Sequence, residues 1–427
     1  MNTQKQTFCC LGLLLFLLLL ACAAPKVVKK KESPEAIDKK ITKLQIRLRE
    51  NPSDYSAFFA LGKLYLAKGD SGQAVCMFDS SLQLNSSYLP AGLEKGKILY
   101  AQGKKLEAYN DFLRILEIDT TEVYLQEVGG VLGLRYHIFP ITEGNHDNAN
   151  PVYSSNGQLI AFQSNRNGNW DVFVMNSEGG EQKQITSNIL DEEEPVFSPN
   201  GEKIFFARQQ AANTKNRDIY VVDLRTGQEK ILIQHPADDW YPVMSPDSKW
   251  LLFVSDRSTT PEGTVSGIYK YSFESRKIFP LLQGPKNYTL PWPHPFESKF
   301  VFTSDATGFY ELYLADYKGK VLRLLTQRHF DHGSPRFSPD GKKIVYFSKR
   351  YGNFDIYLYD LERDADYRLT SSEAYDLSPC FSPEGNHIVF YSNRRGKYQI
   401  YVLDLTMPLT RAEMLDQLRR WVQTTTE

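Results

Sequence analysis

The sequence predicts an α + β multidomain protein, in which a short N-terminal α-solenoid precedes an all-β domain of six repeated units. A pattern of the type P-x-x-S-P-x-G-x-x-I-x-F recurs about every 44 residues after residue 150, and a period of 34 residues runs upstream of it. The six copies begin at Pro151, Pro195, Pro242, Pro291, Pro335 and Pro379. Short strands and turns repeated at a fixed period of this size predict a six-bladed β-propeller.

Each unit contains two strands joined by a tight turn. Proline opens the first strand, where no ladder donor is needed. In the turn at 338–341 (Ser-Pro-Asp-Gly), proline presets φ and glycine accepts a positive φ, so the chain reverses. The second strand, such as 344–346 (Ile-Val-Tyr), is apolar on both faces, as a blade between two neighbours requires. The fourth unit departs most, with 291–295 (Pro-Trp-Pro-His-Pro) in place of the usual turn.

The outer strand of the sixth unit has no clear copy after residues 401–404. A segment of the right shape lies upstream at 138–142, and its Thr142 precedes Thr186 of the first unit by 44 residues. We therefore expect this N-terminal strand to complete the sixth blade and close the ring, which also removes an open sheet edge.

On these repeats, residues 136–408 resemble the TolB-like six-bladed propeller, a WD40-like β-propeller repeat also seen in the non-catalytic propellers of prolyl-oligopeptidase-like enzymes. The resemblance implies the fold and leaves the function open, because the scaffold serves binding proteins and enzymes alike. TolB-like propellers are similar to parts of envelope-spanning complexes, which implies an envelope protein or peptide as the partner.

Residues 1–21 resemble a bacterial lipoprotein signal peptide, because residues 19–22 (Leu-Leu-Ala-Cys) match the lipobox after an apolar stretch too short for a comfortable membrane span. By that resemblance Cys22 carries lipid and anchors the protein in the membrane, and Ala23 favours the outer membrane, facing the periplasm. An ordinary signal peptide with an incidental cysteine is the alternative. Residues 22–33 are expected to be a flexible lysine-rich tether.

The 34-residue period covers residues 34–130 and resembles the tetratricopeptide repeat (TPR), in which small residues let paired helices pack closely around an aromatic wedge. The resemblance implies a groove for an extended peptide or a partner helix. By family position, the residues facing it would be Phe59, Lys63, Leu93, Lys97 and Tyr100. A spacer that docks on the propeller is the alternative.

The C-terminal residues 409–424 are predicted to form an amphipathic helix. Thr410 and Glu413 have the spacing of a capping box, and apolar residues including Met414 and Trp421 follow at helical spacing. Packing against the propeller rim is the favoured interpretation, and a tail that binds a partner is the alternative.

A ring of carboxylates is predicted at one mouth of the propeller channel, because the loop entering each blade ends with acidic residues just before the inner strand. The predicted set is Asp147, Asp191, Glu192, Asp238, Asp239, Asp331, His332 and Asp376. Clustered carboxylates recruit a cation or a basic peptide. The alternative is that each aspartate caps its own turn through backbone N–H groups.

No catalytic signature is present in the sequence: no G-x-S-x-G, H-E-x-x-H, phosphate-binding glycine loop or dinucleotide fingerprint. The formal net charge of −1 gives no reason to expect nucleic acid. The leading hypothesis is a non-catalytic, lipid-anchored periplasmic adaptor. It is expected to need no cofactor or small-molecule substrate, apart from a cation that the carboxylates at the channel mouth could bind. The alternative is a propeller enzyme, a lyase or hydrolase with or without a metal, that acts on saccharide or peptide at the channel mouth. Its site would start from His332, Asp331, Asp376 and Asp147.

Overall fold

The computed structural model describes residues 33–426, apart from 213, 261, 262 and 328. The predicted signal peptide, Cys22 and all but the last residue of the tether lie outside the described residues. The chain forms two compact units, Met1–Ile98 and Leu99–Glu427. Among the described residues, no helix is both long enough and apolar enough to cross a membrane.

Helices build the described part of the first unit, and side chains cap three of them. They are α1 (Pro34–Glu50), α2 (Tyr55–Ala67), α3 (Ser71–Leu84) and α4 (Leu89–Ala101), the last of which continues into the second unit. Ser33, Asp54 and Asp70 each accept a hydrogen bond from a backbone N–H in the first turn of α1, α2 and α3 respectively. Such N-caps satisfy donors that the helix itself leaves unpaired.

Close packing of α2 on α3 depends on a glycine beneath an aromatic ring. Phe78 is fully buried, and a Cβ at Gly62 would lie 2.4 Å from its ring. Helices α2 and α4 begin 34 residues apart, at Tyr55 and Leu89. An N-terminal helical region is thus confirmed, while its assignment as a tetratricopeptide solenoid stays a prediction.

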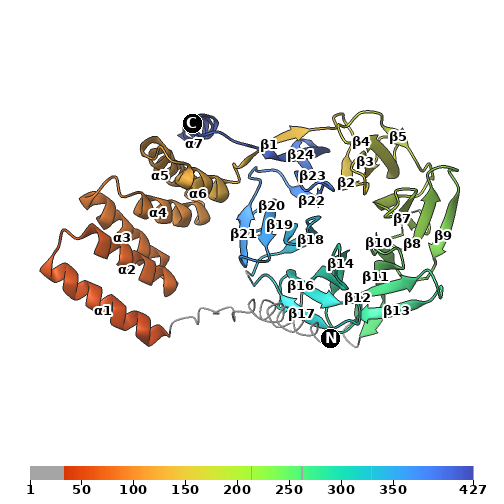
Figure 1. Ribbon diagram of the computed structural model, residues 1–427, viewed down its shortest axis with the longest axis horizontal. Helices are drawn as coiled ribbons and strands as arrows, with labels where there is room; N and C mark the ends of the chain where they lie inside the picture. Colours follow the sequence, from red (N-terminus) through yellow and green to blue (C-terminus); the bar gives the residue numbers. More distant parts are fainter. Residues whose placement is uncertain (1–32, 213, 261–262, 328, 427) are drawn as a thin grey trace, which may run out of the picture. The chain divides into compact units, whose positions relative to one another are not determined.

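Six four-stranded antiparallel sheets form a ring in the second unit (Figure 1), and each sheet is one blade. The innermost strands of blades 1 to 6 are β2 (Asn148–Tyr153), β6 (Glu192–Phe197), β10 (Asp239–Met244), β14 (Tyr288–Pro293), β18 (His332–Phe337) and β22 (Asp376–Phe381). The second strands are β3 (Leu159–Ser164), β7 (Lys203–Gln209), β11 (Trp250–Thr260), β15 (Lys299–Ser304), β19 (Lys343–Ser348) and β23 (His387–Arg395).

The third strands are β4 (Asp171–Asn176), β8 (Arg217–Asp223), β12 (Gly263–Ser272), β16 (Glu311–Asp316), β20 (Asp355–Asp360) and β24 (Lys397–Pro408). The outer strands of blades 1 to 5 are β5 (Lys183–Gln184), β9 (Glu229–Ile233), β13 (Ile278–Leu282), β17 (Val321–Leu324) and β21 (Ala365–Arg368). In blade 6 the outer strand is β1 (Tyr136–Pro140), which pairs with β24 so that Phe139 lies opposite Val402. The prediction that an N-terminal strand closes the ring is confirmed.

In each turn between the first and second strands, a side chain at the start of the turn accepts backbone N–H groups. In blade 5, Ser338 Oγ accepts the backbone N–H of Lys343 at 2.9 Å. Blade 4 keeps the backbone hydrogen bond of this turn, from His294 N–H to the Lys299 carbonyl oxygen at 2.9 Å. Its His294 Nδ1 accepts other N–H groups, those of Phe296 and Glu297, at 3.2 and 3.0 Å. The unusual segment at 291–295 therefore keeps the shared turn, with His294 in place of the serine.

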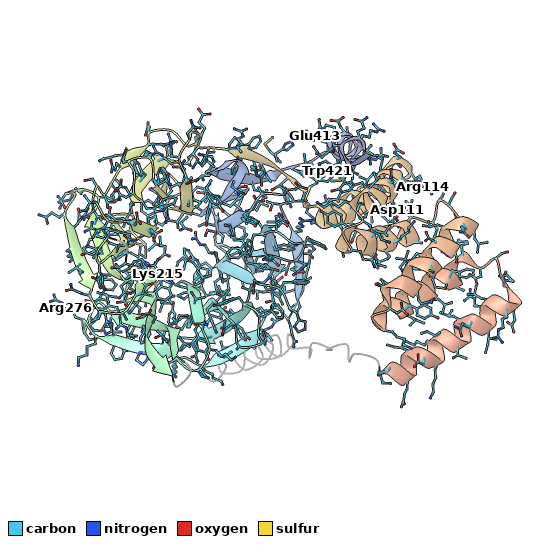
Figure 2. All side chains as sticks on the ribbon, turned by 180° about the vertical axis from the view of Figure 1, so that it is seen from behind. Asp111, Arg114, Lys215, Arg276, Glu413 and Trp421 are labelled. Atoms are coloured by element: carbon cyan, nitrogen blue, oxygen red, sulfur yellow. The ribbon has the colours of Figure 1, made fainter. Side chains whose placement is uncertain are left out.

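Helices α5 (Lys105–Ile118), α6 (Glu122–Leu132) and α7 (Arg411–Thr426) complete the second unit. The predicted capping box starts α7, because Glu413 N–H donates to Thr410 Oγ1 at 3.3 Å and Thr410 N–H donates to Glu413 Oε2 at 2.8 Å. Helix α7, which carries Trp421 (Figure 2), packs against α5. The ring of Trp421 lies 5.0 Å from that of Tyr109. The expectation that α7 packs against the propeller rim is wrong, because its apolar stripe complements α5.

Candidate functional site

Each inner strand is interrupted by one residue with a left-handed backbone, placed directly before its proline. The six residues are Asn150, Glu194, Tyr241, Leu290, Ser334 and Ser378, with φ between 46° and 58°. The strand register shifts at the same point in every blade. A bulge of this kind re-aims a side chain, and all of the six except Ser378 line a cavity on the propeller axis.

The axial cavity is narrow, about 40 Å³, and hydrogen bonds between blades brace its polar side. Ser378 donates to Asn150 Oδ1 at 2.8 Å, and Asn150 Nδ2 donates to Gln163 Oε1 at 2.9 Å. The same Gln163 oxygen accepts the backbone N–H of Glu194 at 2.9 Å. Blades 6, 1 and 2 are therefore linked by one polar chain beside the axis.

Glu194 belongs to a cluster of three carboxylates around one guanidinium group. Arg217 Nη atoms lie 2.8 Å from Asp238, 3.3 Å from Glu194 and 3.6 Å from Glu193. Glu194 also accepts the backbone N–H of Tyr241 at 2.7 Å. Burial raises the pKa of Glu194 to about 7, with Arg217 opposing the shift and Glu193 adding to it. This carboxyl group can therefore hold or release a proton near neutral pH.

A wider axial cavity of about 260 Å³ lies at the other end of the inner strands, among the turns that lead to the second strands. Both cavities are lined by Val196, Val243, Trp292 and Arg336. The two cavities therefore lie end to end on the axis.

The predicted carboxylates lie on the opposite face, which we call the entry face because its loops lead into the inner strands. There Asp191 Oδ1 accepts the backbone N–H of Trp170 in the preceding blade at 2.9 Å. Asp147, Asp238 and Asp331 accept the equivalent N–H groups of Tyr398, Arg217 and Tyr310. These contacts are caps between blades, related to the capping role considered from the sequence. The binding role of these carboxylates stays a prediction.

The other predicted entry-face residues are the first residues of the inner strands, and each is buried against an ionisable side chain of opposite type. Asp239 Oδ1 lies 2.7 Å from Arg257, and Asp376 lies 2.8 Å from Arg394. Glu192 pairs with Arg208 in the same way. His332 Nε2 lies 3.2 Å from Glu311. Neither axial cavity is lined by any of the eight predicted channel-mouth residues.

The arginine partners of these buried carboxylates were not identified from the sequence. Arg257 Nε donates to Ser255 at 2.8 Å, and its guanidinium lies 5.0 Å from the ring centre of Tyr269. The signal is a repeated Ser-x-Arg at the end of the second strand, seen at 164–166, 255–257, 348–350 and 392–394. In blades 3 and 6 this arginine pairs with the acidic residue that begins the inner strand. In blade 1 Arg166 donates to Asn148, and in blade 5 Arg350 pairs with Asp366 of the outer strand, so the motif predicts a buried cation but not which strand supplies its partner.

His332 does not form the start of a metal site. Its side chain is fully buried and packs edge-on against the ring of Tyr346, with centroids 5.4 Å apart. In the part of the chain that the structure describes, no three His, Cys, Asp or Glu side chains gather so that they could hold a metal ion. The structure therefore does not assemble His332 with Asp147 and Asp376.

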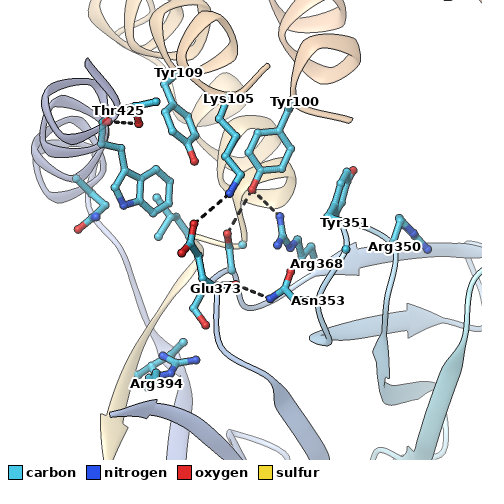
Figure 3. A pocket seen from close by; sticks show the side chains of 18 of the residues that line it. Tyr100, Lys105, Tyr109, Arg350, Tyr351, Asn353, Arg368, Glu373, Arg394 and Thr425 are labelled. Carbon is cyan, nitrogen blue, oxygen red and sulfur yellow. Dashed lines mark hydrogen bonds and ion pairs between the residues drawn. The ribbon is translucent and has the colours of Figure 1, made fainter. Parts of the chain in front are cut away.

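A cleft of about 900 Å³ lies within the second unit (Figure 3). Its walls come from α5 and α7, from β1, and from the loops of blades 5 and 6 on the entry face. Aromatic rings line it, among them Tyr109, Tyr136, Tyr351 and Trp421. An ion pair between Lys105 of α5 and Glu373 of the loop into blade 6 crosses the cleft at 3.5 Å (Figure 3).

Arg368 at the end of β21 holds one wall of this cleft to the propeller. Its guanidinium lies 2.5 Å from Asp355, donates to the Tyr100 hydroxyl at 2.8 Å and stacks on Tyr351 at 4.7 Å (Figure 3). Tyr100, predicted to face a helical groove, is 6% exposed here. Its contacts with blade 5 make it part of the cleft.

Three of the other predicted groove residues also have contacts within their own unit. Phe59 packs against the ring of Phe78 with centroids 5.7 Å apart. Lys63 and Lys97 lie 3.0 and 3.2 Å from the Glu94 carboxylate. Leu93, the remaining one, is buried. Whether this surface binds a peptide stays a prediction.

Family models match the propeller in two overlapping parts. Residues 139–332 match the Tricorn protease N-terminal beta propeller domain, and residues 311–414 match the TolB beta propeller domain. The β domain is a TolB-like six-bladed propeller.

Two curated proteins match short stretches of the chain. The uncharacterized peptidase YuxL of Bacillus subtilis is 35% identical over 66 residues, or 15% of this chain and 10% of that protein. DnaJ homolog subfamily C member 3 of Homo sapiens is 32% identical over 72 residues, or 17% of this chain and 14% of that protein. This chain thus spans a small part of either relative.

Several solved structures are similar to this chain at low sequence identity. A putative TolB from Agrobacterium tumefaciens is 16% identical, with 65% of this chain and 98% of that chain covered and a TM-score of 0.49. TolB from Acinetobacter baumannii is 19% identical, with 70% of each chain covered and a TM-score of 0.45. An oligogalacturonate lyase from Vibrio parahaemolyticus is 14% identical, with 63% and 93% covered and a TM-score of 0.47.

Proposed function

We propose that this protein is a non-catalytic, lipid-anchored adaptor of the cell envelope, and that its cleft binds a peptide segment of another envelope protein. The observation that carries the proposal is the cleft itself, because about 900 Å³ between α5, α7 and blades 5 and 6 accommodates several residues of an extended chain. Rings such as Tyr109, Tyr351 and Trp421 supply contact area at a low cost in conformational entropy.

The charges of the cleft wall support a peptide rather than a strongly charged ligand. Arg350, Arg368 and Arg394 line the cleft, but each pairs with a carboxylate of its own blade. The Lys105–Glu373 pair is largely exposed, so it contributes little and can open for a ligand. What the cleft offers is therefore mainly aromatic surface and hydrogen-bonding groups.

The anchor, the compartment and the helical repeats are part of the same proposal. The match to the TolB beta propeller domain is consistent with a location in the envelope. Lipid on Cys22 would hold the protein at the outer membrane, and the helical region would act as a tetratricopeptide solenoid. Replacing Cys22 with alanine is expected to abolish incorporation of labelled fatty acid and to release the protein from membranes, whereas a fully retained, labelled variant would contradict the anchor.

The cleft is tested by site-specific photocrosslinking of the full-length protein in native membranes. A photoreactive residue replaces Gln417 in the cleft, and a matched control replaces the exposed Lys277 of blade 3. We expect a discrete envelope protein to crosslink from position 417 only. The crosslinked segment, made as a peptide, is then titrated against Tyr351→Ala and against Phe309→Ala, an exposed aromatic on the equivalent loop of blade 4.

Tyr351→Ala is expected to weaken peptide binding by about tenfold, since loss of one buried aromatic contact removes 1 kcal/mol or more. Phe309→Ala should bind like the unaltered protein. Equal affinity of both variants, or equal crosslinking from both positions, would contradict the proposed binding site.

A further inference from the structure

The wide axial cavity differs from the cleft in shape and in chemistry, and we call it the turn-face funnel. Its rim carries a proline at the second position of the turn in five blades: Pro199, Pro246, Pro295, Pro339 and Pro383. Blade 1 has Ser155 at this position. Below the rim the wall is largely apolar, with Val152, Val196, Val243, Trp292 and Cys380.

Arg336 is the one charged side chain among the described residues that line the funnel. Its guanidinium stacks on the Trp292 ring at 4.5 Å, and Nη1 donates to the carbonyl oxygen of Pro151 at 3.2 Å. No carboxylate of the described chain lies within ion-pair distance of it. Arg257 and Arg394, by contrast, each have an aspartate at 2.7 to 2.8 Å.

An arginine placed in this way is a site for an anion. A guanidinium that leaves water for an apolar surface is stabilised by an anionic partner, and its planar group can hold a carboxylate through two parallel hydrogen bonds. Trp292 fixes the orientation of the guanidinium from one side. The serine hydroxyls of the turns add little, because those of Ser198 and Ser338 donate to side chains of their own turns.

The inner end of the funnel limits what can enter. Beyond Arg336 the axis narrows to the cavity of about 40 Å³, where Glu194 and Tyr241 project. A chain that enters through the proline rim therefore has to stop near Arg336, and the ionised form of Glu194 would repel a second negative charge. An end of a chain fits this geometry better than a loop.

We propose that the turn-face funnel binds the free α-carboxylate of a polypeptide whose last residues are apolar, with Arg336 as the carboxylate receptor. Five proline turns preset the rim, which reduces the entropy lost on binding. The funnel and the cleft open at opposite ends of the inner strands. The funnel would therefore give the adaptor a second binding site, independent of the peptide site in the cleft.

The test is calorimetric titration of the full mature protein with acetyl-Ala-Ala-Leu-Phe, as the free acid and as the C-terminal amide. We expect the free acid to bind about tenfold or more tightly than the amide, because only the acid makes a charge-assisted pair. Arg336→Gln should abolish this preference, and Arg336→Lys should keep part of it. Equal binding of acid and amide, or no binding of either at millimolar peptide, would overturn the proposal.

A surface variant keeps the test valid if Arg336→Gln fails to fold. Ser155→Glu adds a negative charge at the rim and should weaken binding of the acid severalfold, with Ser155→Gln as the neutral control. Unchanged acid binding in Ser155→Glu would count against the funnel. If 3-phenylpropionate binds as tightly as the peptide acid, the funnel is a site for small carboxylates and the peptide assignment is wrong. Tyr351→Ala in the cleft should leave these affinities unchanged, so the two proposals fail separately.

Discussion

The charged side chains at the two ends of the propeller channel differ in whether they have a partner of opposite charge. On the entry face, Asp239 and Asp376 are buried against arginines of their own blades, and Asp191 caps a backbone N–H of the neighbouring blade. On the turn face, Arg336 has a carbonyl and an indole ring as neighbours but no carboxylate among the described residues. Charges that recur in several blades and are paired stabilise the fold, whereas Arg336 occurs once, has no carboxylate partner among the described residues and is available for a ligand.

The largest predicted effect comes from breaking an entry-face pair. Asp239→Ala should lower the free energy of unfolding by about 3 kcal/mol or more, because it leaves Arg257 partly buried without its partner. Urea denaturation measures this loss, with Glu274→Ala at an exposed turn of the same blade as the control. A loss no greater than that of the control would show that the recurring pairs do not stabilise the blades.

Glu194→Gln should change how stability depends on pH. Because burial raises the pKa of Glu194 from its ordinary 4.5 to about 7, the folded state binds more protons than the unfolded state between these values. The contribution of Glu194 to the free energy of unfolding therefore falls as pH rises from 4.5 to 7, by roughly 3 kcal/mol at most. The variant should lack this fall and be more stable at pH 8. Urea titrations at several pH values that run parallel for both proteins would contradict the shift.

Removing an inter-blade cap should have a smaller effect. Asp191→Ala deprives the Trp170 N–H of its acceptor and should lower the free energy of unfolding by about 1 kcal/mol. Asp191→Asn keeps an acceptor oxygen and should lose less. The cap assignment fails if the two variants are equally stable.

Arg336→Gln should have the smallest effect on stability, below about 1 kcal/mol, since it removes one hydrogen bond and one ring contact and leaves no buried charge unpaired. Thermal unfolding of Arg336→Gln and Asp239→Ala under the same conditions compares their losses of stability directly. A loss as large as that of Asp239→Ala would place Arg336 among the structural charges and remove the distinction between the two faces.

Much of the fold could be predicted from the sequence, because the repeated pattern contains the serine, proline and glycine residues that specify the turn between two strands. Ring closure was predicted for residues 138–142, because the sixth unit lacks an outer strand and this segment before the first unit has the right shape. The observed strand is β1, Tyr136–Pro140. The α7 contact could not be predicted in the same way. Its apolar stripe fits any complementary surface, and only the structure shows that Tyr109 of α5 supplies it.

The candidate site was harder to predict, because aspartate before a strand serves equally for capping and for binding. The axial residue Glu194 was missed, although it stands directly before the proline that marks each repeat. Its orientation depends on a left-handed bulge that no residue type in the pattern indicates. The cleft depends on contacts such as Tyr100 with Arg368, which lie 268 residues apart in the chain.

The most direct test of the account compares three proteins with the peptide identified by crosslinking from position 417. They are the unaltered protein, Tyr351→Ala in the cleft, and the entry-face variant carrying Asp191→Asn, Asp238→Asn and Asp331→Asn. We expect Tyr351→Ala to weaken binding by about tenfold and the triple variant to bind normally. Weakened binding in the triple variant with normal binding in Tyr351→Ala would contradict the cleft as the peptide site and would favour binding at the ring of carboxylates on the entry face.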